Sequence, residues 1–180
     1  MKEIINNLLE KKIGVFPCDT VWGLVGILDD KVAKKIQEIK HRKEAKPLIC
    51  LLKNKDELEK YASEITPYTH DLIEQNWPGP LSIIVKKREV ISNQITAGKD
   101  TICFRVPNFE PLNHLLNQID RPLISTSCNL EGQATIQSID QIDPLIMSEV
   151  SFIYDKAVPK EGVASKIIEC TGPEPKVLRK

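Results

Sequence analysis

A short polar segment, residues 40–46, concentrates positive charge where a helix must end. Four of its seven residues are cations: Lys40, Arg42, Lys43 and Lys46. The following Pro47 disfavours helical backbone before it, so we expect the helix to end near Lys40. Beyond that point residues two apart share a side, and Lys40 and Arg42 are then able to point at one anion. Solvated cations that complement the helix dipole are the alternative.

Hydroxyl, amide and guanidinium groups elsewhere in the chain extend this set. They are Thr20, Ser125, Ser127, Ser165, Asn129 and Arg105. Together with the cations of residues 40–46, these side chains are suited to phosphate and carboxylate oxygens. Ser127 and Asn129 stand two apart and are able to face one ligand, with local side-chain to backbone turns as the alternative. The sequence has neither a Gly-x-x-x-x-Gly-Lys phosphate loop nor a Gly-x-Gly-x-x-Gly dinucleotide fingerprint.

A short predicted strand ends at Pro17, and residues 18–24 form a polar turn that leads into apolar residues. Gly23 and Gly26 in this region allow a ligand to approach the backbone closely. Trp22 and Trp77 could line a base-binding pocket, but aromatic rings beside turns more often fill the core. Cys18 has no histidine placed near it by a motif, so a nucleophilic thiolate is not expected there.

Composition restricts the possible functions. The 25 lysines and arginines balance 25 acidic residues, so general polyanion binding has no global electrostatic support and any anion site must be local. The five cysteines form no Cys-x-x-Cys pair and the three histidines have no metal-ligand spacing. We therefore expect free thiols and no transition-metal site built by the protein. No signal peptide or membrane-spanning apolar run is recognised, which predicts a cytoplasmic location without membrane contact.

Hydrophobic periodicity predicts strands interleaved with helices. Helices are expected at 4–9, 30–40, 55–62, 66–75, 109–119 and 138–147, and strands at 13–16, 48–52, 81–85, 101–106, 122–124, 152–154, 165–170 and 176–179. In the strand at 101–106, Ile102 and Phe104 alternate with Arg105, which therefore points away from the core face. These elements predict one α/β domain over residues 1–180, with a twisted, mixed β-sheet flanked by helices.

Seven motifs in the same order resemble those of the threonylcarbamoyl-AMP synthases, the YrdC-like family also called TsaC, along nearly the whole chain. They are Pro-Cys-Asp-Thr-Val-Trp-Gly-Leu at 17–24, Lys-His-Arg with Pro-Leu at 40–48, Trp-Pro-Gly-Pro-Leu-Ser at 77–82, Arg-Val-Pro at 105–107, Ser-Thr-Ser-Cys-Asn at 125–129, Ser-Lys-Ile-Ile-Glu at 165–169 and Leu-Arg at 178–179.

The resemblance implies a YrdC-like fold around a basic cavity, and a nucleotidyltransferase. The implied substrates are L-threonine, bicarbonate and ATP, and the products are threonylcarbamoyl-AMP and pyrophosphate for t6A37 modification of tRNA. It also implies Mg²⁺ brought with ATP, a t6A-forming transferase complex as product acceptor and a weak tRNA contact. Because the chain ends at Lys180, it is similar to the short, single-domain form of the family.

The resemblance also assigns residues. ATP would be held by Lys40, Arg42, Lys46, Thr101, Ser125, Ser127, Asn129, Thr135 and Arg179. Threonine would be held by Thr20, Arg105 and Ser165, with Thr101 bordering both ligands. The catalytic set would be Lys40, Arg42, Ser127 and Asn129, with no metal-ligating residue. Cys18 replaces the usual threonine and Leu51 the frequent histidine of the family, which leaves the amino-acid specificity open.

Two other functions compete with the synthase. The basic window at residues 31–46 is compatible with an RNA-binding or ribosome-assembly module that has no turnover. A relative with the same cavity but another acceptor, such as the carbamoyl-transferring domain of hydrogenase-maturation proteins, is the second. Those domains normally adjoin acylphosphatase-like and zinc-binding segments, which this sequence does not show.

Overall fold

The computed structural model describes residues 1–42, 44–159 and 161–180, so Lys43 of the predicted cationic segment lies outside the described residues. Within these ranges, nine strands form one mixed sheet in the order β7-β1-β2-β6-β3-β5-β4-β8-β9. Their bounds are β1 (Gly14–Pro17), β2 (Trp22–Ile27), β3 (Ile49–Leu51), β4 (Leu81–Lys86), β5 (Thr101–Arg105), β6 (Leu123–Ser127), β7 (Phe152–Ile153), β8 (Lys166–Glu169) and β9 (Lys176–Arg179). The predicted α/β class and mixed sheet are confirmed.

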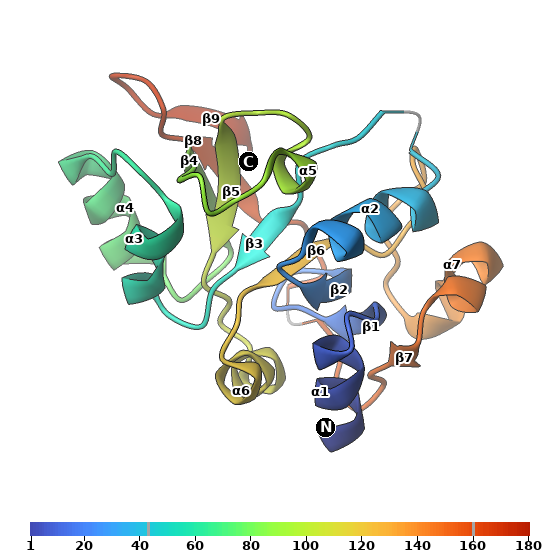
Figure 1. Cartoon of the computed structure of the whole chain (residues 1–180). Helices are drawn as coiled ribbons and strands as arrows, with labels where there is room; N and C mark the ends of the chain where they lie inside the picture. Colours follow the sequence, from blue (N-terminus) through green and yellow to red (C-terminus); the bar gives the residue numbers. More distant parts are fainter. Residues whose placement is uncertain (43, 160) are drawn as a thin grey trace.

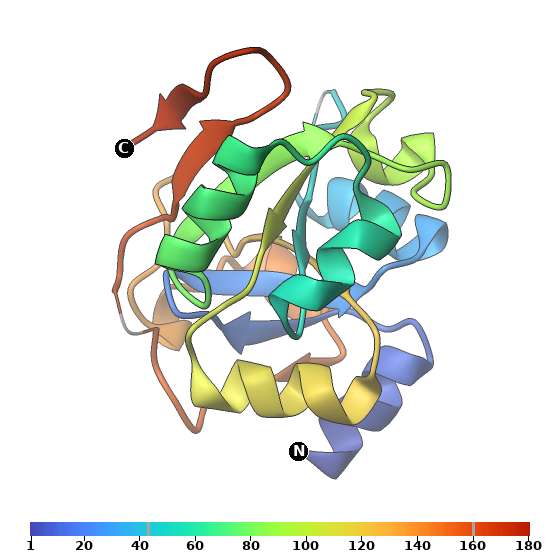
Figure 2. The same ribbon diagram turned by 90° about the vertical axis from the view of Figure 1, so that its left-hand side faces the viewer.

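Helices surround this sheet (Figure 1). They are α1 (Lys2–Leu9), α2 (Asp30–Ile39), α3 (Leu58–Tyr61), α4 (Pro67–Asn76), α5 (Asn93–Thr96), α6 (Glu110–Ile119) and α7 (Pro144–Glu149), with 3-10 turns η1 (Lys55–Glu57) and η2 (Ile139–Gln141). The sheet twists strongly, since β1 and β2 run across the view of Figure 2 whereas β5 runs steeply through it. None of the helices in the described ranges is both long and apolar enough to cross a bilayer.

Strand β6 connects the two halves of the sheet. It pairs antiparallel with β2 on one side, where Gly23 lies opposite Ser127, and antiparallel with β3 on the other, where Ile49 lies opposite Ser125. The hydroxyl-rich end of β6 therefore lies between the β1–β2 hairpin and the strand that follows α2. This topology brings segments distant in sequence to one place.

Helix α2 ends where the sequence predicts. Asp29 caps its N-terminus by accepting from the N–H groups of Lys31 and Val32, and Lys40 is the C-cap residue. Next to it His41 has a φ of 48°, and this left-handed backbone turns the chain away from the helix axis. The loop that follows the helix carries Arg42 and Lys46.

The structure differs from the predicted elements in several places. Residues 22–27, expected only as apolar sequence after a turn, form β2, which pairs with β1 in a hairpin. Both faces of β2 are buried, so it lacks the alternation that marks a half-exposed strand. The polar connection after β4 contains α5. The helix expected at 138–147 is divided into η2 and α7, because Pro144 cannot donate a backbone hydrogen bond and instead starts a helix.

The two glycines of β2 serve different purposes. A Cβ on Gly26 would lie 2.4 Å from Val32 Cγ1, so at this position the close approach is made by α2 and not by a ligand. A Cβ on Gly23 would lie 2.8 Å from Ser125 Oγ. Gly23 thus keeps space for the polar end of β6.

Gly26→Ala is expected to destabilise the protein by about 1–3 kcal/mol, because the added methyl group overpacks the contact between β2 and α2. Urea denaturation followed by circular dichroism measures the change. Gly172→Ala is the matched control, since its Cβ would lie 3.8 Å from its nearest neighbour, Glu174 O. An unchanged midpoint for Gly26→Ala would contradict this account of the packing.

Candidate functional site

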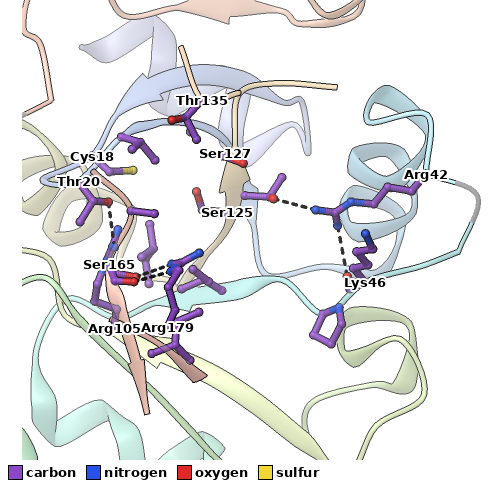
Figure 3. A pocket seen from close by; sticks show the side chains of 18 residues that line it. Cys18, Thr20, Arg42, Lys46, Arg105, Ser125, Ser127, Thr135, Ser165 and Arg179 are labelled. Carbon is purple, nitrogen blue, oxygen red and sulfur yellow. Dashed lines mark hydrogen bonds between the residues drawn. The ribbon is translucent and has the colours of Figure 1, made fainter. Parts of the chain in front are cut away.

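A cavity of about 290 Å³ opens where the hairpin turn, the end of β6, the loop after α2 and strands β8 and β9 meet. Figure 3 shows its polar side chains converging from these separate elements. Its cations are Arg42, Lys46, Arg105 and Arg179, and its hydroxyl groups belong to Thr20, Ser125, Thr126, Ser127, Thr135 and Ser165. Among the described lining residues there is no carboxylate. The cavity is therefore suited to anions.

Arg105 is the most deeply buried of these cations, with 3% of its surface exposed. Its Nη1 donates to Thr20 Oγ1 at 3.0 Å (Figure 3), and its Nη2 lies 3.2 Å from Asp19 Oδ1. The latter is a charge contact without the geometry of a hydrogen bond, and Arg105 Nε has no partner in the described part of the chain. Asp19 Oδ2 in turn accepts from the backbone N–H of Asn108 at 3.2 Å. The guanidinium is thus held firmly while part of its donor capacity stays unused.

Asp19 was not among the predicted site residues, although it precedes Thr20 directly. Its burial, 2% exposed, requires a partner, because an isolated carboxylate is strongly disfavoured inside a protein. The signal in the sequence was an acidic residue between a strand and a threonine. Its partner, Arg105, could not be identified from that signal, since it lies far along the chain.

Arg179 enters the cavity from β9, which pairs antiparallel with β8. Its Nε donates to Ser165 O at 2.7 Å and its Nη2 donates to Ser165 Oγ at 3.1 Å (Figure 3). The Ser165 hydroxyl also lies 2.8 Å from Ser82 Oγ. Burial lowers the pKa of Arg179, yet a guanidinium stays charged at neutral pH.

Arg42 and Lys46 form the opposite wall. Arg42 Nη2 donates to Thr126 Oγ1 at 3.1 Å, and Lys46 Nζ forms an ion pair with Glu131. Burial is the main cause that lowers the pKa of Arg42, and the nearby Glu131 acts in the opposite direction. Both cations belong to the segment 40–46, which the sequence analysis identified by its positive charge.

Lys40 lies behind the cavity wall. It is 2% exposed, and its Nζ donates to Ser127 O at 2.6 Å, to Asn129 Oδ1 at 3.0 Å and to Asn129 O. Lys40 and Arg42 therefore do approach one target, but that target is the end of β6. Lys40 fixes the backbone from which Ser127 enters the cavity.

Nine of the twelve predicted site residues line the cavity, and three do not: Lys40, Asn129 and Thr101. Thr101 starts β5, at the end of the strand opposite to Arg105, where it pairs with Lys86. The roles assigned to these three residues stay predictions. The cavity also includes Cys18 and Leu51, the two positions that left the amino-acid specificity open.

The remaining candidates have structural explanations. Trp22 and Trp77 are buried, and their indole N–H groups donate to Gln137 O at 3.4 Å and Leu81 O at 2.7 Å. Both rings fill the core, as the sequence favoured. Burial raises the pKa of Cys18 to about 11, so its thiol is protonated at neutral pH. No group of three or more His, Cys, Asp or Glu residues in the described ranges is placed to hold a metal ion.

The fold and cavity define an α/β protein whose cavity lining is suited to anionic ligands. Comparison with known families matches residues 6–180 to the Sua5_yciO_yrdC family, described as "Telomere recombination". The chain belongs to this family.

Individual relatives agree with this assignment. The chain is 33% identical to threonylcarbamoyl-AMP synthase from Pyrococcus abyssi, over 94% of this chain and 50% of the relative. It is 35% identical to a putative threonylcarbamoyl-AMP synthase from Methanocaldococcus jannaschii, over 93% of this chain and 77% of the relative. The structure of P. abyssi Sua5 complexed with L-threonine superposes with a TM-score of 0.93 at 32% identity, over 99% of this chain and 53% of the other. This chain thus spans about half the length of the P. abyssi protein.

The Lys40 ammonium is expected to titrate near pH 8. Burial is the main cause that lowers its pKa to about 8, and the positive charge of Arg42 adds to the effect. The unfolded state therefore binds more protons between pH 8 and an ordinary lysine pKa of about 10.4, so this group adds stability as pH rises through that window. Carbon-13 NMR of labelled lysine side chains measures the midpoint, with Lys40→Met identifying the signal. A midpoint near the ordinary lysine value would contradict the expected effect of burial.

Proposed function

We propose that the cavity binds ATP, L-threonine and bicarbonate and produces threonylcarbamoyl-AMP and pyrophosphate. The observation that carries the proposal is the convergence of four cations and six hydroxyl groups on one cavity whose described lining contains no carboxylate. Relatives named threonylcarbamoyl-AMP synthase support it, as does the P. abyssi structure with L-threonine. Membership of the family would not by itself identify threonine as the amino-acid substrate.

The two walls of the cavity suggest where the ligands bind. Arg42 and Lys46, with the hydroxyl groups at the end of β6 and Thr135, would hold the ATP phosphates. Arg105 and Thr20, joined by a hydrogen bond, would hold the threonine carboxylate and hydroxyl together with Ser165. Arg179, which donates to Ser165, would border both ligands.

The reaction needs positioning and charge stabilisation more than a side-chain nucleophile. The threonine amine adds to bicarbonate with loss of water and forms a carbamate. A carbamate oxygen then attacks the α-phosphorus of ATP, and the bond to the β-phosphate oxygen breaks to release pyrophosphate. Arg42 and Lys46 would stabilise the charge that develops on the phosphate oxygens. The protonated Cys18 thiol would only shape the pocket.

Mg²⁺ is proposed to accompany ATP and to neutralise phosphate charge when bound. Since no carboxylate belongs to the described cavity lining, the phosphates and water would supply most of its ligands. The chain's cations and hydroxyl groups would orient the nucleotide around it.

The product would pass to a t6A-forming transferase complex, with weak tRNA contact by this chain. A cytoplasmic location would give access to ATP and tRNA. It would also agree with the five cysteines, all of which are unpaired and buried.

Incubation with ATP, bicarbonate and single amino acids is expected to release pyrophosphate with L-threonine and to form threonylcarbamoyl-AMP, detected by mass spectrometry. Serine and valine test the contributions of the threonine methyl and hydroxyl groups. If folded protein gives no threonine-dependent product, the proposal is wrong. Tight, steeply salt-dependent RNA binding without turnover would instead favour the RNA-binding module.

Arg42→Ala and Arg105→Lys are expected to separate the two ligands. Loss of the Arg42 charge should weaken ATP binding about tenfold or more, whereas threonine binding should change little. Arg105→Lys keeps the charge that faces Asp19 but loses the planar fork, so the KM for threonine should rise about tenfold with ATP affinity nearly unchanged. Calorimetry and steady-state kinetics measure these effects. The opposite pattern would reverse the assignment of the two walls.

A further inference from the structure

The side chain of Gln37 contacts the loop that supplies two of the cavity's cations. Gln37 lies on the buried face of α2, with 9% of its surface exposed. Its Nε2 donates to Lys46 O at 2.7 Å, and its Oε1 accepts from Lys46 N at 3.3 Å. The amide thus pairs with both backbone polar groups of Lys46, as a neighbouring strand would.

Arg42 is attached to the same glutamine. Its Nη1 donates to Gln37 Oε1 at 3.0 Å, and its backbone N–H donates to Gln37 O at 3.4 Å. An amide oxygen has two lone pairs, and here Arg42 and Lys46 use both. With Nη1 held on this side, Arg42 Nη2 reaches Thr126 Oγ1 across the cavity wall at 3.1 Å.

An amide suits this position better than a carboxylate or an apolar group. A carboxylate would neutralise Arg42 and place a negative charge against the carbonyl of Lys46. An apolar side chain would leave the backbone groups of Lys46 and one edge of Arg42 without these partners. Glutamine holds the Arg42 guanidinium and the backbone of Lys46 without adding a negative charge of its own.

We propose that Gln37 is a positioning residue for the polyphosphate part of the ligand, acting through Arg42 and Lys46. Gln37 does not line the cavity, so it acts without touching the ligand. The identity of the polyphosphate as ATP rests on the proposed function. The inferred positioning itself rests on the contacts of Gln37.

Gln37→Met tests this role with a side chain of similar length that lacks the amide. ATP affinity is expected to fall about tenfold, the size of roughly one lost positioning hydrogen bond to a charged group, while the KM for threonine changes less than about twofold. Gln37→Glu is expected to weaken ATP binding at least as much, because it neutralises Arg42. Gln75→Met, on the exposed surface of α4, is the matched control and should leave both values unchanged.

A double-mutant cycle separates positioning from general damage to the fold. In the Arg42→Ala background, Gln37→Met should weaken ATP binding by clearly less than in the wild type, because part of its effect passes through Arg42. Equal effects in both backgrounds would overturn the inference. A parallel loss of ATP affinity, threonine affinity and Tm would also overturn it, since that pattern indicates a purely structural role.

Two measurements keep the inference distinct from the proposed function. Amide hydrogen exchange at Lys46, followed by NMR, should be slow in the wild type and in Gln75→Met and faster in Gln37→Met. Faster exchange with unchanged ATP affinity would overturn the positioning role. If the wild type does not bind ATP, the proposed function is wrong, and tripolyphosphate becomes the probe. Equal tripolyphosphate binding by wild type and Gln37→Met, or none by either, would then overturn the inference.

Discussion

The structure holds four positive charges around one cavity with fewer carboxylates beside them than cations. Like charges repel more strongly where water is excluded, so each cation needs partners that fix its position. Most of the partners are neutral oxygen atoms, such as Ser165 O and Oγ for Arg179 and Thr126 Oγ1 and Gln37 Oε1 for Arg42. Arg105, the most deeply buried of the four, contacts the buried carboxylate of Asp19, and Lys46 pairs with Glu131 at the exposed side of the cavity. The cavity consequently keeps a positive potential while its side chains stay in place.

Strand β6 determines how these neutral partners are arranged. It carries three consecutive hydroxyl residues into the cavity, and it lies between β2 and β3 in the sheet. From outside the cavity, Lys40 donates a hydrogen bond to the carbonyl of Ser127, the last residue of β6. Lys40 therefore supports the site through the main chain of Ser127, and its predicted role toward ATP stays a prediction. Removal of the Lys40 side chain would therefore alter both the stability of the protein and the shape of the cavity.

The sequence predicted the elements with clear periodicity and most of the polar lining. Helix α2, its end at Lys40 and the final strand pair follow from local patterns, and the resemblance to a family located Arg179 and Thr135. Strand β2 was missed because burial on both faces removes alternation, and Pro144 divided a helix that periodicity alone extends. The sequence did not predict the roles of residues whose partners are brought close only by the fold. Asp19 contacts Arg105, which is distant in sequence, and Gln37 contacts a loop whose path the sequence does not determine. The position of Lys40 behind the cavity wall was beyond the sequence for the same reason, because extended-chain geometry does not distinguish a side chain that faces a cavity from one that faces the neighbouring strand.

The ion pair between Lys46 and Glu131 joins the loop after α2 to the loop after β6 at the solvent-exposed side of the cavity. A phosphate bound as proposed would compete with this carboxylate for the same ammonium group. Added salt weakens the attraction of the cavity for the ligand, but it also weakens the internal competitor. Anion binding at this wall would therefore depend less steeply on ionic strength than the charge of Lys46 alone suggests, because Glu131 pairs with that charge in the ligand-free protein.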